Sequence, residues 1–279
     1  MLGLLLAVVS AVGVWLTWRV FVDTAAGQRV DHAVFAGAHF GRNRLWQVAY
    51  PVLDLVSVPY IAGVLGAAVL IAVMRRRWGM AVQVALLVGG ANLTTRVLKT
   101  VVLSRPDLGA TPLFSNALPS GHTTAAASVS AALVFVVPAR ARPWAAAFGA
   151  LYTAATGVST LVGGWHRPSD AVAGVLVVLA WSGLACALAA SSRGAGGSSP
   201  RRRRLPALGS GGGLLVLAGI GAALPAAYSL RASWTTVGAL NSRAELLVAY
   251  GGGAFGVIAA SALAFAVLLF VRQSAERVV

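Results

Sequence analysis

The sequence has few charged residues and a single cysteine. Only 10% of its 279 residues are charged, and seven residues are acidic. Soluble domains carry about 25% charged residues, so this chain cannot cover a water-facing surface of its size. The scarcity of charge excludes an ordinary soluble enzyme, a disordered chain and a fibrous protein. The lone cysteine, Cys186, excludes an intrachain disulfide and a cysteine-rich metal site.

Apolar residues fill the sequence instead. They make up 58% of it, and the mean hydropathy is +0.81. Eight stretches are apolar and close to the ~20 residues that a membrane-spanning helix needs. We therefore predict an all-α fold, a polytopic transmembrane helical bundle of about eight spans. The spans are approximately Leu2–Phe21, Pro51–Met74, Met80–Leu98, Thr123–Val137, Trp144–Val162, Ser169–Ala190, Leu214–Leu230 and Leu246–Val271.

The net charge of +15 would indicate a nucleic-acid partner in a soluble chain. Here the arginines stand in short clusters between apolar stretches, which is how membrane topology is encoded, so we expect no nucleic acid. Alternate loops carry 12 basic residues with one acid, Glu276, and the other loops carry 10 with six acids. The positive-inside rule predicts a multi-pass protein of the cell membrane with both termini cytoplasmic. The alternative, a cleaved signal peptide in Met1–Ala26, lacks the basic segment that such peptides begin with.

Two segments between the spans are polar. Ser191–Gly213 is rich in Gly, Ser, Pro and Arg, and we expect a flexible cytoplasmic linker between residues 1–190 and 214–279. Its run Arg201–Arg204 either sets topology or binds anionic lipid. Asp23–Gln47 is expected to be a loop, either an amphipathic connector or a surface that touches the lipid headgroup.

Polar residues also gather next to three span ends. After the third span, Lys99 and Arg105 suit an anionic phosphate, unless both only anchor the span at the interface. Before the fourth span, Ser120 and Gly121 open a helix, where free backbone N–H groups bind anions, unless Ser120 is only a helix cap. His122 lies just inside this helix and suits proton donation to a leaving group.

The third cluster precedes the sixth span. His166 and Asp170 are four residues apart and so share a helix face. A carboxylate on one imidazole nitrogen leaves the other as a base or nucleophile. The alternative is a structural His–Asp cap. All three clusters fall on the non-cytoplasmic side of the predicted topology, so we expect one site there.

The clusters resemble the three motifs of the type 2 phosphatidic acid phosphatase (PAP2) superfamily of integral-membrane lipid phosphatases. These motifs are Lys-x6-Arg-Pro, Pro-Ser-Gly-His and Ser-Arg-x5-His-x3-Asp. The second is complete at Pro119–His122, and the His-x3-Asp of the third is complete at His166 and Asp170. The resemblance runs from Asn92 to about Ala190. It implies a six-helix PAP2-like catalytic core, to which the last two spans and a short tail are added.

The resemblance implies a lipid phosphatase that works through a phosphohistidine on the extracytoplasmic face. His166 would attack phosphorus, Asp170 would orient it, and His122 would protonate the leaving oxygen and then activate water. The implied phosphate-binding residues are Lys99, Arg105, Ser120 and Gly121. No metal and no cofactor is implied, because Lys, Arg and helix N-termini would stabilise the charge. The implied substrates are prenyl phosphates or diphosphates, phosphatidylglycerol phosphate and phosphatidic acid.

Two positions depart from the family pattern. Lys99 precedes Arg105 by six positions instead of seven. Because Pro106 disfavours the helical conformation of the residue before it, we expect the helix to unwind there, so that Lys99 still reaches the site. Thr160 stands where the family has Arg, and Arg167 is the residue expected to replace it in phosphate binding.

Other functions remain open at this stage. The same fold suits a phosphotransferase that passes the phosphoryl group to another acceptor. The two departures also fit a catalytically impaired lipid-binding or transport protein. The expected partners are the lipid substrate and membrane lipids, and a homo-oligomer stays open.

Overall fold

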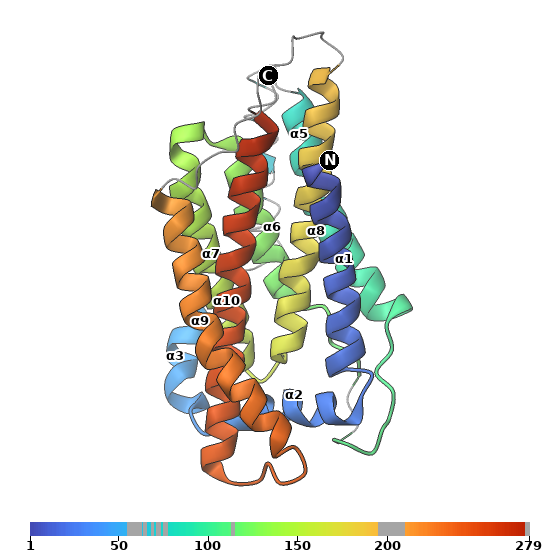
Figure 1. Ribbon diagram of the computed structural model, residues 1–279, viewed down its shortest axis with the longest axis vertical. Helices are drawn as coiled ribbons and strands as arrows, with labels where there is room; N and C mark the ends of the chain where they lie inside the picture. The colour runs from blue at the N-terminus through green and yellow to red at the C-terminus, as the bar shows by residue number, and fades with distance from the viewer. Residues whose placement is uncertain are drawn as a thin grey trace.

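The computed structural model describes residues 1–54, 78–112, 115–194 and 210–276, and five single positions between residues 63 and 74. This part of the chain holds α-helices and no strand, which confirms the all-helical bundle (Figure 1). The elements are α1 (Leu2–Phe21), α2 (Ala25–Ala38), α3 (Arg42–Asp54), α5 (Trp78–Val97), η1 (Leu98–Val102), α6 (Gly121–Val136), η2 (Ala139–Ala141), α7 (Arg142–Val162), α8 (Pro168–Gly194), α9 (Ser210–Thr235) and α10 (Arg243–Glu276).

Six of these helical segments are long and apolar enough to cross a membrane: α1, α5 with η1, α7 with η2, α8, α9 and α10. They coincide with six of the eight predicted spans. α6 is apolar but has only 16 residues, and it matches the short fourth span. The predicted span Pro51–Met74 lies mostly outside the described residues.

The expectation of a loop at Asp23–Gln47 was wrong. α2 starts after Thr24, whose hydroxyl accepts the N–H of Gly27 at 3.0 Å as an N-cap. α3 follows, and α2 lies across the lower end of the bundle in Figure 1, packed against α10 and α1. The segment is too polar to cross a membrane, but a helix that packs against the end of a bundle needs only one apolar face.

α8 is the central helix and packs against α1, α5, α6 and α10. It approaches α1 closely: a Cβ atom on Gly3 would lie 2.6 Å from the carbonyl oxygen of Gly183. Small residues allow this approach between membrane helices. The packing brings the end of η1, the start of α6, the end of α7 and the start of α8 together near α2, at the end of the bundle opposite the start of α1 (Figure 1).

Candidate active site

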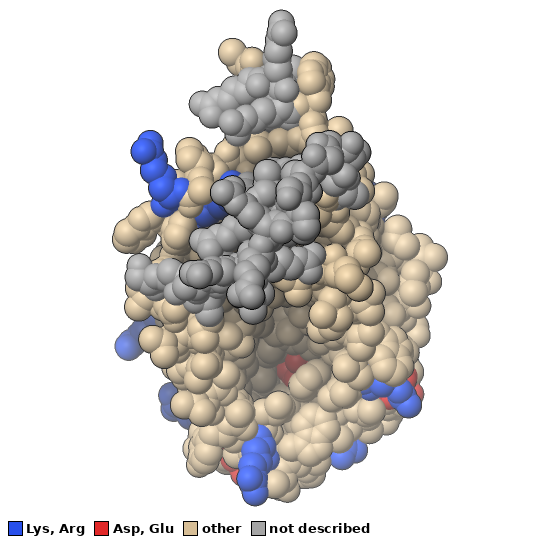
Figure 2. All heavy atoms as spheres, turned by 45° about the horizontal axis from the view of Figure 1, so that its top comes forward, with Lys and Arg blue, Asp and Glu red and all other residues tan. Residues whose placement is uncertain are grey.

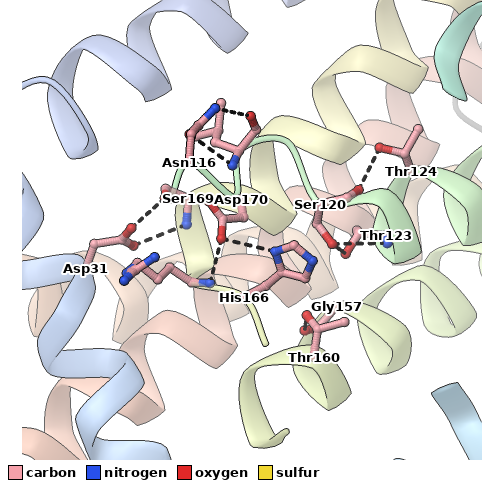
Figure 3. Close-up of polar contacts among 12 residues, drawn as sticks. Asp31, Asn116, Ser120, Thr123, Thr124, Gly157, Thr160, His166, Ser169 and Asp170 are labelled. Carbon is pink, nitrogen blue, oxygen red and sulfur yellow. Dashed lines mark hydrogen bonds and ion pairs between the residues drawn. The ribbon is translucent and has the colours of Figure 1, made fainter. Parts of the chain in front are cut away.

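His166 and Asp170 form a buried pair at the start of α8. Nδ1 of His166 lies 3.1 Å from Oδ2 of Asp170, which also accepts the backbone N–H of Arg167 at 2.9 Å (Figure 3). The two side chains belong to residues that are 8% and 2% exposed. Because Nδ1 faces the carboxylate, Nε2 is the nitrogen left for chemistry.

The start of α6 adjoins this pair. Ser120 caps α6, since its Oγ accepts the N–H of Thr123 at 3.3 Å, and its own N–H donates to the backbone oxygen of Asp170 at 2.8 Å. That bond fixes α6 to α8. Open space borders Gly121, where an added Cβ would meet nothing within 4 Å. The first N–H groups of a helix lack intrahelical acceptors, so this space suits an anion.

His122 faces His166 across the site. Their ring centroids are 6.4 Å apart, and the ring of Trp165 lies 5.4 Å from that of His122. Trp46 of α3 packs edge-on against Trp165 at 5.6 Å. The two histidines are therefore close enough to act on one substrate from different sides.

The helix ends before Arg105, as predicted. Lys99 lies in η1, a π-helix that follows α5, and the chain is extended at Leu103 (φ −101°, ψ 125°). Lys99 on η1 acts electrostatically on His122 and Asp170. Nη2 of Arg105 is buried and has no hydrogen-bond partner among the described residues. Burial lowers the pKa of Arg105, as does the charge of Arg167, but a guanidinium stays charged at neutral pH.

Residues that the sequence did not single out complete the site. Asp31 of α2 is buried and accepts the O–H of Ser169 at 2.6 Å and its N–H at 3.3 Å (Figure 3). Burial and the nearby Asp170 raise the pKa of Asp31 to about 7. The side-chain amide of Asn116 donates to the backbone oxygen of Leu103 at 2.9 Å, two residues before Arg105. No motif signals these contacts, because they join distant parts of the chain.

Thr160, which stands where the family has Arg, is fully buried, so the effect of restoring an arginine at this position can be predicted. The hydroxyl of Thr160 donates to the backbone oxygen of Gly157 at 2.7 Å. The backbone oxygen of Thr160 accepts the N–H of His166 at 3.3 Å. Arg167 is also buried, beside His166. An arginine at 160 would overfill this space, at a cost of about 1–3 kcal/mol or more. We expect Thr160→Arg to lower Tm and to lower kcat/KM at least about tenfold. Thr160→Ser should keep both quantities close to those of the wild type. A gain in activity would contradict this.

The residues predicted from the three motifs thus meet at one end of the bundle, with Arg167 among them. Within the described ranges, no three His, Cys, Asp or Glu side chains are grouped as metal ligands would be. In a comparison with protein families, residues 78–192 match the model of the PAP2 superfamily. Searches among curated proteins and among solved structures give no significant match.

Proposed function

Residues 78–192 belong to the PAP2 superfamily, and on that premise we propose that the chain is an integral-membrane lipid phosphatase. Its substrate is a phosphate monoester or diphosphate of a lipid, of the prenyl phosphate, phosphatidylglycerol phosphate or phosphatidic acid class. The observation that carries the proposal is the buried His166–Asp170 pair at 3.1 Å with His122 opposite it. The six apolar helices support a substrate taken from the membrane.

The reaction has two steps. In the first, Nε2 of His166 attacks phosphorus, and an N–P bond forms as the P–O bond to the lipid breaks. Protonated His122 gives its proton to the departing lipid oxygen. In the second, neutral His122 takes a proton from water, whose oxygen attacks phosphorus and releases phosphate from His166. Asp170 stabilises the positive charge on His166 during transfer.

Cationic and backbone donors stabilise the transferred group. Lys99, Arg105 and Arg167 supply positive charge, and the orphan Nη2 of Arg105 is a donor ready for a phosphoryl oxygen. The hydroxyl of Ser120 and the N–H of Gly121 add donors at the positive end of α6. Such preorganised donors stabilise the charge that develops in the transition state.

We place this site on the extracytoplasmic face. The basic residues Arg140, Arg142 and Arg272 lie at or near helix ends away from the site, at the start of α7 and near the end of α10 (Figure 1). This arrangement supports the topology that the positive-inside rule predicts.

The proposal is tested by phosphate release from a panel of lipid phosphates and diphosphates by the purified protein. We expect turnover that survives a metal chelator, because the site uses cationic side chains. Transfer to an added alcohol in preference to water would favour a phosphotransferase. Lipid binding without any phosphate release would favour the catalytically impaired binding protein and reject the proposal.

A cavity of about 360 Å³ adjoins α8 and is a candidate for one hydrocarbon chain of the substrate. It lies between α1, α2, α8, α9 and α10, and its lining is mainly apolar. Apolar cavities in proteins stay dry and accept apolar ligands. Figure 2 shows a hollow in the apolar surface with an acidic group at its floor.

Filling the cavity should select against long chains. A Cβ on Gly256, which lines the cavity, would meet its nearest neighbour at 3.9 Å, so the backbone here has room for a side chain and Gly256→Leu is expected to occupy part of the cavity. We expect KM for a long-chain lipid phosphate to rise about tenfold, the effect of roughly two lost buried methylenes, with little change for a short-chain soluble ester. Gly251→Leu on the same helix is the control, because its Cβ would meet nothing within 4 Å. An equal loss on both substrates would contradict this placement.

A further inference from the structure

Asp31 is a buried carboxylic acid that the proposed chemistry does not use. It is 2% exposed, and among the described residues that line the cavity beside α8 it is the only charged one. A buried carboxylate is costly unless hydrogen bonds and opposite charges compensate for its lost hydration. The hydrogen bonds that Asp31 accepts from Ser169, 138 residues away in the sequence, therefore compensate for part of its lost hydration.

Two carboxylates hold the first turn of α8 from different sides (Figure 3). Asp170 accepts the N–H of Arg167 and faces Nδ1 of His166, while Asp31 accepts both the N–H and the hydroxyl of Ser169. The N–H groups of a first helical turn lack intrahelical acceptors, and negative charge is favourable there. Because Ser169 directly precedes Asp170, a shift of Ser169 would move Asp170 and, through it, the ring of His166.

The charge of Asp31 also acts on the phosphate-binding arginines. Arg105 and Arg167 repel each other, and both interact with the carboxylates of Asp31 and Asp170. The described residues of α9 and α10 that line the cavity beside Asp31, such as Ala249 and Gly253, are uncharged. The charged groups that face Asp31 thus come from the active site itself.

We infer that Asp31 is a positioning residue for phosphate transfer: through Ser169 it holds the first turn of α8, and its negative charge keeps Arg105 and Arg167 in place, without touching the phosphate. This inference rests on the proposed function. α2, which carries Asp31, lies outside the segment 78–192 that matches the family.

The protonation state of Asp31 gives this role a measurable signature. Burial, with Asp170 nearby, raises the pKa of Asp31 to about 7, so both forms are present near neutral pH. The ionised form accepts the stronger, charge-assisted hydrogen bonds from Ser169. Asn at position 31 keeps an acceptor oxygen but lacks the charge, so Asp31→Asn resembles the protonated form at every pH.

The test compares kcat and KM of wild type, Asp31→Asn and Asp31→Ala from about pH 6 to about pH 9, a range that brackets the pKa. We expect the wild-type to Asp31→Asn ratio of kcat to be near one at the acidic end. It should rise to about tenfold at the basic end, with a midpoint near 7, because only the wild type gains the charge. KM is expected not to rise. Asp31→Ala should have lower kcat at all pH values.

Gln28→Ala is the matched control, because Gln28 is equally buried on α2 and donates to backbone oxygens rather than to α8. Its ratio to wild type should not vary with pH. A flat ratio for Asp31→Asn with an active wild type would overturn the role of Asp31 and leave the proposed function intact. Inactivity of every protein, wild type included, would reject the proposed function and this inference together.

Discussion

Replacement of His166 by alanine is expected to abolish phosphate release, with a loss of at least ~10³-fold in kcat, as for other covalent nucleophiles. The reason is that no other described side chain combines a free imidazole nitrogen with a buried carboxylate partner, which here lies 3.1 Å from Nδ1. Without His166, direct attack by water would have to occur in a site arranged for attack by nitrogen.

Two measurements distinguish the loss of the nucleophile from a general loss of structure or binding. His39→Ala removes an exposed histidine at the end of α2, and this control should retain wild-type activity. Lipid binding by His166→Ala should persist, because the cations and the first turn of α6 remain. Turnover by His166→Ala equal to that of wild type would rule out the nucleophile assignment.

His122→Ala is expected to lower kcat on a lipid phosphate by about 10²–10⁴-fold. On an aryl phosphate with an acidic leaving group, the rate of the first step should fall much less. A lipid alkoxide is a poor leaving group and needs the proton that His122 donates, whereas a nitrophenolate leaves without it. The ring centroids of His122 and His166 are 6.4 Å apart, so the two side chains can act on the same phosphate ester.

The dependence on the leaving group separates proton donation from a structural role. The measurement is the burst of phenolate release by rapid mixing, compared with lipid turnover by the same variant. A comparable loss on both substrates would mean that His122 supports the site without donating the proton. His166→Ala serves as the reference, because it should lose both reactions.

The motifs identified most residues of the candidate site, because each motif spans only a few neighbouring positions. His166 and Asp170 lie one helical turn apart, and Ser120 opens a helix whatever surrounds it, so short-range rules apply. Pro106 similarly indicated that the helix after Lys99 unwinds. That these clusters meet could be inferred from their common position at predicted span ends, and the packing of α5, α6, α7 and α8 brings them together.

Asp31 could not be predicted in this way. It has no recognisable motif, and its partner Ser169 lies on a distant helix, so no spacing rule connects them. The segment that carries it was expected to be a loop because it is too polar to span a membrane. Burial of a carboxylic acid depends on which helices surround it, and that information exists only in the folded bundle.

The most direct test of the central claim is to trap the phosphorylated enzyme. His122→Ala mixed with an aryl phosphate should accumulate phosphohistidine, because the first step needs no proton donor and the second lacks its base. Rapid quenching at alkaline pH and mass spectrometry of peptides should then find one phosphoryl group on His166, absent from the double variant with His166→Ala. Continued phosphate release with no phosphoryl group on His166, or a phosphoryl group on another residue, would contradict the account.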